Sequence, residues 1–270
     1  MARRRRKQAS LASLAITALV AVVAWGYNTW QQSQPATQAP ATTTVAAKGD
    51  QATYAKLAAL DYPNDSDPVI DVNGGHAGLS LSDWAGPRIQ YGDLDSLNRT
   101  TTNVGDLDAR TLIKSAGRPG QSFTPTGWHN RYTWVDGRRV NRQNRGHLIA
   151  YTLSGNLDAD GHYSAGALGS SDNPKNLASQ TEYANQVLMQ PFEQQVRDAL
   201  AKHQRVIYKV TTVFRGSELM PRGYWLRAKA LQGLDFNVYI YNVQTGIRYD
   251  YATGRSRVDQ SVTVPESAKQ

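Results

Sequence analysis

The first hydrophobic stretch of the chain is long enough to cross a membrane. No charged residue occurs over residues 9–30, and residues 11–25 are Leu, Ala, Ile and Val apart from one Ser, one Thr and a final Trp. A bilayer core needs about 20 such residues in a helix. We therefore predict a transmembrane anchor at residues 9–30. The basic tail at residues 1–8 should remain cytoplasmic, which places the rest of the chain outside the cytoplasm.

A cleaved signal peptide is the alternative interpretation of this stretch, and it would make the protein secreted instead of a single-pass protein of the cell membrane. No small-x-small cleavage site directly follows the apolar run, which favours the anchor. Residues 31–53 are rich in Gln, Ala, Thr and Pro, a composition that predicts a flexible linker. The folded domain is then predicted over residues 54–265.

Helical spacing occurs over residues 181–203. Leu188, Phe192, Val196 and Leu200 recur every four residues and would form one apolar face. Pro191 interrupts this pattern, so it should either kink the helix or begin a second one.

Alternating apolar and polar positions predict strands at residues 206–214, 236–241 and 247–251, with a turn at residues 242–246 between the last two. Shorter strand-like segments occur at residues 140–150 and 176–179. Because strands and helices do not alternate regularly, the fold class is predicted as α+β.

The net charge of +8 is set mainly by the N-terminal tail, since residues 50–270 carry 24 basic and 22 acidic residues. Within the body, residues 110–149 hold eight basic residues and one acid, Asp136. This segment is either a phosphate-facing patch or an ordinary solvated face. Residues 50–108 are acidic and either form an outer part of a sheet or regulate access to the basic half. The absence of cysteine excludes thiolate chemistry and disulfides.

Arg145-Gly146-His147 is the segment with the clearest chemistry. A neutral imidazole can take a proton from water near pH 7, and a guanidinium can hold a phosphate through two hydrogen bonds. A glycine between them permits an unusual backbone angle. Taken alone the pattern is weak, because a histidine in a strand is more often structural than catalytic.

Further motifs follow in a fixed order. Residues 173–180 read Asn-Pro-Lys-Asn-Leu-Ala-Ser-Gln, Asn185 lies 38 positions after His147, and Glu193 follows eight residues later. Residues 126–129, 235–238 and 242–246 add separate matches. With these motifs the chain resembles the DNA/RNA non-specific endonucleases of the ββα-metal (His-Me finger) superfamily, and most closely their membrane-bound competence nuclease branch. The family usually has aspartate where this chain has Asn144, which puts the fine positioning of the loop in doubt.

The resemblance implies roles for four residues. His147 would be the general base, and Arg145 would bind the scissile phosphate. Asn185 would be the direct protein ligand of a Mg²⁺ ion that keeps most of its waters, and Glu193 would hold those waters. Mg²⁺ and Mn²⁺ both suit oxygen ligands of this kind.

Other residues near these motifs are candidates for substrate contacts. Asn176 and Gln180 match positions close to the family's metal and substrate site. Basic residues that could contact backbone phosphates are Lys175, Arg138, Arg139 and Arg142. Such contacts carry no sequence information, and each of these cations also has a plain surface-charge interpretation.

The resemblance implies a ββα-metal finger within a central, mostly antiparallel sheet flanked by helices. It also implies a sequence-non-specific endonuclease that hydrolyses DNA and RNA outside the cytoplasm, in DNA uptake or in scavenging. Two other functions compete with it, a non-catalytic cell-surface nucleic-acid receptor and a cell-wall-associated structural domain. The first predicts a damaged catalytic set and the second leaves the ordered motifs unexplained. The sequence identifies no protein partner.

Overall fold

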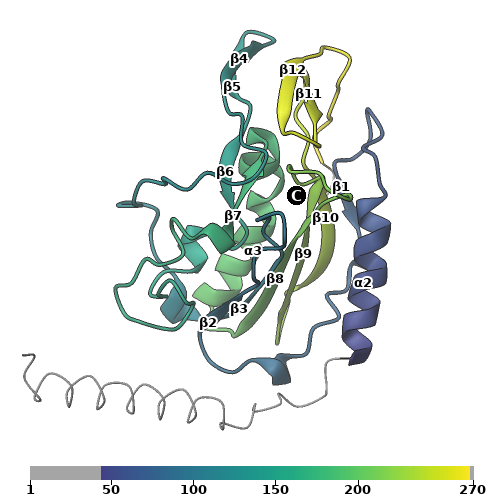
Figure 1. The fold of residues 1–270 in the computed structure, drawn as a ribbon. Helices are drawn as coiled ribbons and strands as arrows, with labels where there is room; N and C mark the ends of the chain where they lie inside the picture. Colours follow the sequence, from purple (N-terminus) through teal and green to yellow (C-terminus); the bar gives the residue numbers. More distant parts are fainter. Residues whose placement is uncertain (1–43, 268–270) are drawn as a thin grey trace, which may run out of the picture. The chain divides into compact units, whose positions relative to one another are not determined.

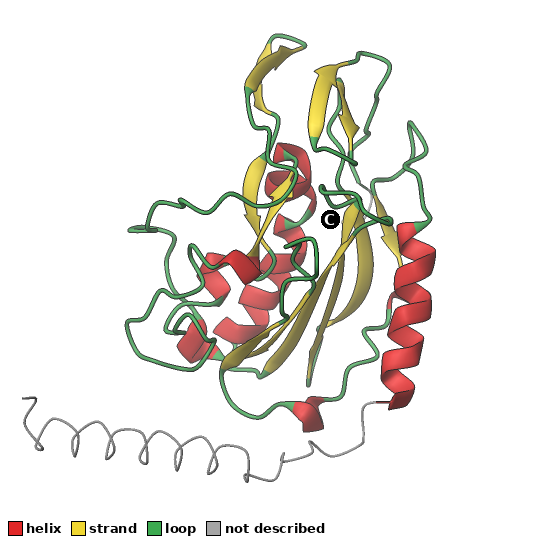
Figure 2. Ribbon diagram, viewed as in Figure 1, coloured by secondary structure: helices red, strands yellow, loops and turns green. Residues whose placement is uncertain are grey.

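The computed structural model describes residues 44–267 (Figures 1 and 2). The chain divides into two units, residues 1–50 and residues 51–270, and the sheets and the site described below belong to the second unit. The predicted anchor at residues 9–30 and the tail before it lie outside the described residues. Between residues 44 and 267 no helix has the length and apolar character that a membrane span requires.

A six-stranded antiparallel sheet forms the centre of the second unit (Figure 1). Its strands, in spatial order, are β1 (Val69–Asp71), β10 (Asp235–Tyr241), β9 (Gly223–Ala230), β8 (Val206–Val213), β3 (Thr102–Leu107) and β2 (Arg88–Tyr91). The strands predicted at 206–214 and 236–241 are confirmed as β8 and β10. The acidic half supplies both edge strands, β1 and β2, as well as β3, so it does form an outer part of the sheet.

Both faces of this sheet are covered, which explains why its central strands are buried almost throughout. Side chains alternate between two apolar clusters, because successive residues of a strand point to opposite faces. Leu226 and Phe236 enter the cluster beneath helix α3 (Gln190–Ala201). Trp225 and Tyr239 enter the cluster on the opposite face, where Leu57 of helix α2 (Thr44–Ala58) packs.

Helix α2 covers the end of the segment predicted as a flexible linker, which is a correction for residues 44–53. Two contacts explain the order of its C-terminal part. Leu57 is buried in the second apolar cluster, and the backbone N–H of Phe214 donates to the hydroxyl of Tyr54 at 2.9 Å. Packing of these side chains stabilises a helix that composition alone does not predict.

Three small two-stranded antiparallel sheets accompany the main sheet. They pair β4 (Tyr132–Val135) with β5 (Arg138–Asn141), β6 (Asn144–His147) with β7 (Leu177–Gln180), and β11 (Ile247–Asp250) with β12 (Arg255–Val258). The strand predicted at 140–150 is therefore replaced by parts of two strands, β5 and β6, that belong to different small sheets. Strand β11 is confirmed, but residues 242–246 connect two sheets instead of closing a hairpin with β10.

The helical segment after β7 has a break at the proline. A π-helix (Ala184–Leu188) comes first, with the Met189 N–H donating to the Ala184 carbonyl, and α3 then begins with Pro191 in its first turn. Because proline has no N–H to donate, the first turn of a new helix is where it costs least. The alternative that Pro191 starts a second helix is confirmed. Single 3₁₀ turns lie at Asn73–Gly75, Leu81–Asp83, Ala109–Thr111, Tyr151–Leu153 and Pro174–Asn176.

Candidate active site

The antiparallel pair β6–β7 and the helix after it bring the predicted site residues into one substructure. Register pairs Arg145 with Ser179 and His147 with Leu177, so Arg145 and His147 project from the same face of β6. Gly146 lies between them. Its φ is not positive, so the predicted unusual backbone angle is wrong. Glycine is required because a Cβ there would overlap the carboxamide oxygen of Gln180.

His147 is almost completely buried, with 6% of its surface exposed. Its Nε2 lies 2.9 Å from the backbone carbonyl oxygen of Ser171. A carbonyl oxygen can only accept, so Nε2 carries the proton and the neutral ring keeps its lone pair on Nδ1. The ring is thus held in the tautomer that a general base needs.

Burial, and to a smaller extent the positive charge of Arg118, lower the pKa of His147 to about 4. The Ser171 carbonyl and the Asp172 carboxylate act in the opposite direction. The imidazole is therefore neutral and able to accept a proton at every pH above about 5.

Arg118 lies in the loop between Thr111 and β4 and joins the site, although no sequence motif includes it. Its guanidinium lies over the ring of Tyr151, 5.3 Å from the ring centre. With Glu193 and Arg197 it lines an open cavity of about 490 Å³ beside Ala150, three residues after His147. Two arginines and one carboxylate thus surround a space large enough for a phosphate group.

Glu193 reaches this cavity from α3, and 13% of its side chain is exposed. Burial raises its pKa to about 7, although the nearby charges of Arg197 and Arg118 lower it. Arg197 follows one helical turn later and lies 3.8 Å from the Glu193 carboxylate. No sequence motif indicated Arg118 or Arg197 as a site residue. The spacing of four residues after Glu193 could have indicated Arg197.

Asn185 lies in the π-helix and is half-buried. Its backbone N–H donates to the Thr181 carbonyl at 3.0 Å, while its side-chain amide makes no hydrogen bond within residues 44–267. An amide oxygen with no protein partner is a donor that suits a hydrated Mg²⁺ ion, and Glu193 follows on the next helix. The described part of the chain contains no group of three His, Asp or Glu side chains placed to hold a metal.

Arg145 extends over Trp128, with its guanidinium carbon 4.7 Å from the ring centre. Its Nε is buried and has no partner among the described residues. The Asn144 carboxamide oxygen accepts from the Asn141 side chain at 2.6 Å, and the Asn144 nitrogen is buried without a partner. The oxygen of asparagine thus performs the hydrogen bonding that an aspartate would offer here.

Asn176 and Gln180 are fully buried, so neither side chain is open to a substrate in this structure. The Asn176 oxygen accepts from the Ile149 N–H and from the Asn103 side chain, both at 3.0 Å. These bonds join the segment after β6 to β3 of the main sheet. The Gln180 side chain fills the space beside Gly146. Asn176 and Gln180 therefore both stabilise the region around β6 and β7.

The predicted phosphate-contacting cations lie in different surroundings. Lys175 is paired with Asp93 at 2.7 Å, and Arg142 donates to the Ser256 carbonyl at 2.8 Å. Arg138 pairs with Glu182 at 2.8 Å but keeps 68% of its side chain exposed. Arg139 is exposed on the same hairpin. Arg138 and Arg139 are therefore the two of these residues most open to a substrate.

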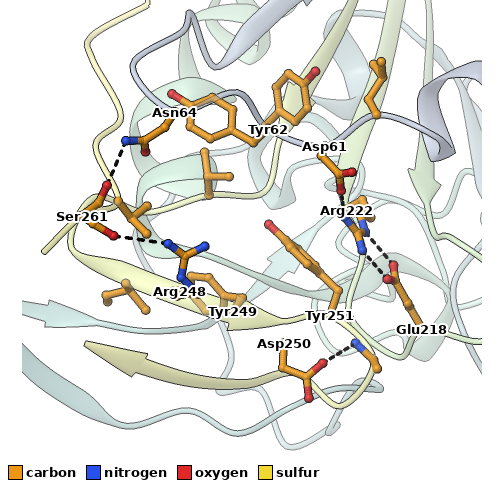
Figure 3. Close-up of a pocket in the computed structure, with 16 residues that line it drawn as sticks. Asp61, Tyr62, Asn64, Glu218, Arg222, Arg248, Tyr249, Asp250, Tyr251 and Ser261 are labelled. Atoms are coloured by element: carbon orange, nitrogen blue, oxygen red, sulfur yellow. Dashed lines mark hydrogen bonds and ion pairs between the residues drawn. The ribbon is translucent and has the colours of Figure 1, made fainter. Parts of the chain in front are cut away.

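A cavity of about 730 Å³ lies between the loop after α2 and β11 (Figure 3). Of its two arginines, Arg222 is held at 2.5 Å by both Asp61 and Glu218, and Arg248 pairs with Asp259 at 2.6 Å. Its aromatic wall includes Tyr251, whose hydroxyl donates to the Asn242 carbonyl at 2.9 Å. These arginines are thus already paired with carboxylates, and no histidine lines the cavity.

Comparison with known proteins agrees with this geometry. A sequence model of the DNA/RNA non-specific endonuclease family matches residues 79–231. The crystal structure of NucA from Streptococcus agalactiae with bound magnesium superposes with a TM-score of 0.64 and 28% identity, covering 81% of this chain and 100% of that one. The metal-free NucA structure gives 0.62 and 26%, covering 80% and 100%. Sda1 nuclease with bound zinc shares the fold, at 0.54 and 21%, covering 75% and 98%.

The family match spans more than half of the chain. The chain therefore belongs to the DNA/RNA non-specific endonuclease family, and it is a nucleic-acid hydrolase with a mixed α/β fold built on an antiparallel sheet.

Proposed function

We propose that this hydrolase is a metal-dependent, sequence-non-specific endonuclease of DNA and RNA, and that β6, β7 and the following helix form a ββα-metal finger. The orientation of His147 carries the proposal. Its Nε2 donates to the Ser171 carbonyl at 2.9 Å, which leaves Nδ1 to accept a proton from the attacking water. A receptor without activity would have no need of a buried histidine held in this tautomer.

The three arginines near the base would bind the phosphate. Arg118 and Arg197 line the cavity, and Arg145 leaves the same face of β6 as His147. A planar guanidinium can make two parallel hydrogen bonds to phosphate oxygens and offset the charge that builds up during attack. None of these groups requires a 2′-hydroxyl, so DNA and RNA are both expected substrates.

Asn185 and Glu193 would hold the metal, with the amide oxygen as direct ligand and the carboxylate bonded to the waters. A bound Mg²⁺ would stabilise negative charge on the phosphate and the leaving oxygen. The NucA structure with bound magnesium supports this choice, and Mn²⁺ suits the same donors. The pKa of Glu193, raised to about 7, implies that metal binding favours its ionised form and releases a proton below neutral pH.

The test uses the full-length chain, supercoiled plasmid and a structured RNA, each with Mg²⁺ or with EDTA. Both substrates should be cut only with metal, and His147→Ala should lower the rate by about 10³-fold. His162→Ala is the matched control, because His162 is an exposed histidine outside the site. Cleavage by His147→Ala within tenfold of the parent would exclude His147 as the base. Binding of DNA by the parent without any cleavage would instead favour the receptor.

We also propose that residues 9–30 anchor the enzyme in the cell membrane with the hydrolase domain outside, where it would act in DNA uptake or scavenging. The uncharged run and the preceding arginines support this arrangement. Membrane fractions should contain the full-length chain at its full mass, and external protease should digest the domain. Release of a shortened protein into the medium would indicate a cleaved signal peptide.

A further inference from the structure

The hairpin β4–β5 has one face packed and one face open. On the packed face, Val135 and Val140 are buried in a cluster with Ile247 and Tyr249 of β11. On the open face, Tyr132 is 60% exposed and Trp134 is 67% exposed. Figure 1 shows this hairpin projecting away from the main sheet beside β11–β12. Two large aromatic residues therefore face solvent on a hairpin whose opposite face is packed against β11.

Trp134 differs from the other tryptophans in the described part of the chain. Trp84, Trp128 and Trp225 each lie beneath an arginine guanidinium, at 4.5, 4.7 and 4.0 Å from the ring centre. No ring and no cation covers Trp134 within residues 44–267. The face of this indole is therefore available for stacking.

The charges around the indole suit a nucleic acid. Register pairs Trp134 with Arg139, whose guanidinium also lies 3.9 Å from the ring centre of Tyr132. Arg138 is exposed on the same hairpin, but register places it on the face of Val135, and the single acid of the hairpin is Asp136 in the turn. An open ring with a cation beside it is the arrangement by which proteins bind unpaired bases through stacking and contact their phosphates at the same time.

The hairpin is also joined to the catalytic substructure. The Asn141 N–H donates to Glu182 at 2.7 Å, and Arg138 pairs with the same carboxylate, three residues before Asn185. Arg139 precedes Arg145 by six residues, so at most about 20 Å of chain separates them. About six stacked nucleotides cover that distance. One strand can therefore contact the indole and the catalytic arginine together.

We propose that the outer face of β4–β5, formed by Tyr132, Trp134 and Arg139, is a stacking platform for unpaired bases of the substrate. Resting on the proposed nuclease function, this platform gives the enzyme a preference for single-stranded or locally unpaired nucleic acid over intact duplex. Bases within a duplex are stacked on their neighbours and do not expose a face to the indole.

The experiment measures binding and cleavage of a 12-nucleotide single strand and the matching duplex by the full-length chain. Trp134→Ala should weaken single-strand affinity, measured in the His147→Ala background, by about tenfold and duplex affinity by less than twofold. Trp134→Phe should restore most of the loss, because phenylalanine can still stack. The salt dependence of binding should remain that of the parent for Trp134→Ala and decrease for Arg139→Ala.

Leu231→Ala provides the matched control, since Leu231 is 80% exposed at the turn between β9 and β10. It should bind and cut both substrates as the parent does. If the parent cuts nucleic acid but Trp134→Ala binds both substrates unchanged, the platform is overturned while the nuclease function stands. Equal losses on single strand and duplex would also overturn it, because they would indicate a general contact instead of stacking. An inactive parent would fail the nuclease function itself, whereas the Trp134 comparison depends only on binding.

Discussion

The main sheet and the β6–β7 pair with its following helix α3 both bury their residues, but burial has different consequences in the two regions. In β8, β9 and β10 it covers apolar side chains on both faces, which stabilises the fold. In β6–β7 and α3 burial covers titratable groups, and it moves the pKa of His147 to about 4 and that of Glu193 to about 7. Burial therefore stabilises the main sheet, whereas in β6–β7 and α3 it selects the protonation states of titratable groups.

The largest expected effect is on the stability of the sheet. Leu226→Ala removes a fully buried side chain beneath α3 and should lower the free energy of unfolding by about 3 kcal/mol. Urea denaturation measures this change. The same substitution at exposed Leu231 should cost less than about 0.5 kcal/mol. The cleavage rate per folded molecule should remain that of the parent in both, and a tenfold fall for Leu226→Ala would break the comparison.

The second prediction concerns the positive charge of Arg118 beside the site. Arg118→Ala should reduce kcat/KM by about 100-fold, because a cation that stabilises developing charge is lost. Arg118 also lowers the pKa of His147, so its removal should move the acidic limb of the pH–rate profile to higher pH. A rate loss without movement of that limb would show that Arg118 does not act on His147.

The third prediction concerns stability against pH. His147 has a pKa of about 4 in the folded chain and an ordinary value near 6.5 when unfolded, so the unfolded state binds the proton more readily between these values. The contribution of His147 should be fully present above pH 6.5 and decline as the pH falls towards 4. It should amount to about 2 kcal/mol lost between pH 7 and pH 5. The free energies of unfolding of the parent and of His147→Gln, measured by denaturation, should therefore converge as the pH falls. A constant difference between them at all pH values would contradict the low pKa.

The smallest expected effect is at Asn144. Asn144→Asp would keep the oxygen that accepts from Asn141 and remove a buried N–H that has no partner. The rate should change by less than about fivefold, since each hydrogen bond of this kind contributes about 1 kcal/mol. Steady-state cleavage of plasmid measures it. A gain of tenfold or more would show that the charge of the usual family aspartate is needed here.

Local patterns predicted much of the framework. Strands β8 and β10 and the face of α3 were evident because side-chain periodicity reports burial on one or two faces. Strand β9 was missed, although it lies in the middle of the sheet. Its residues Arg227 and Lys229 obscure the apolar alternation of Tyr224, Leu226 and Ala228. Helix α2 was missed because its order depends on contacts with β8 and β9, far along the chain.

The sequence by itself predicted the chemical groups of the candidate site and their order, because Arg145, His147, Asn185 and Glu193 stand in motifs that resemble those of the family. Only the tertiary structure decided what those groups can do. The Ser171 carbonyl, 24 residues after His147, selects the tautomer, and Arg118 approaches from a separate loop. Tertiary packing also buries Asn176 and leaves the Trp134 ring open. The physical reason is that a proton's position, a pKa and the accessible face of a ring depend on neighbours that the folded chain brings together from distant segments.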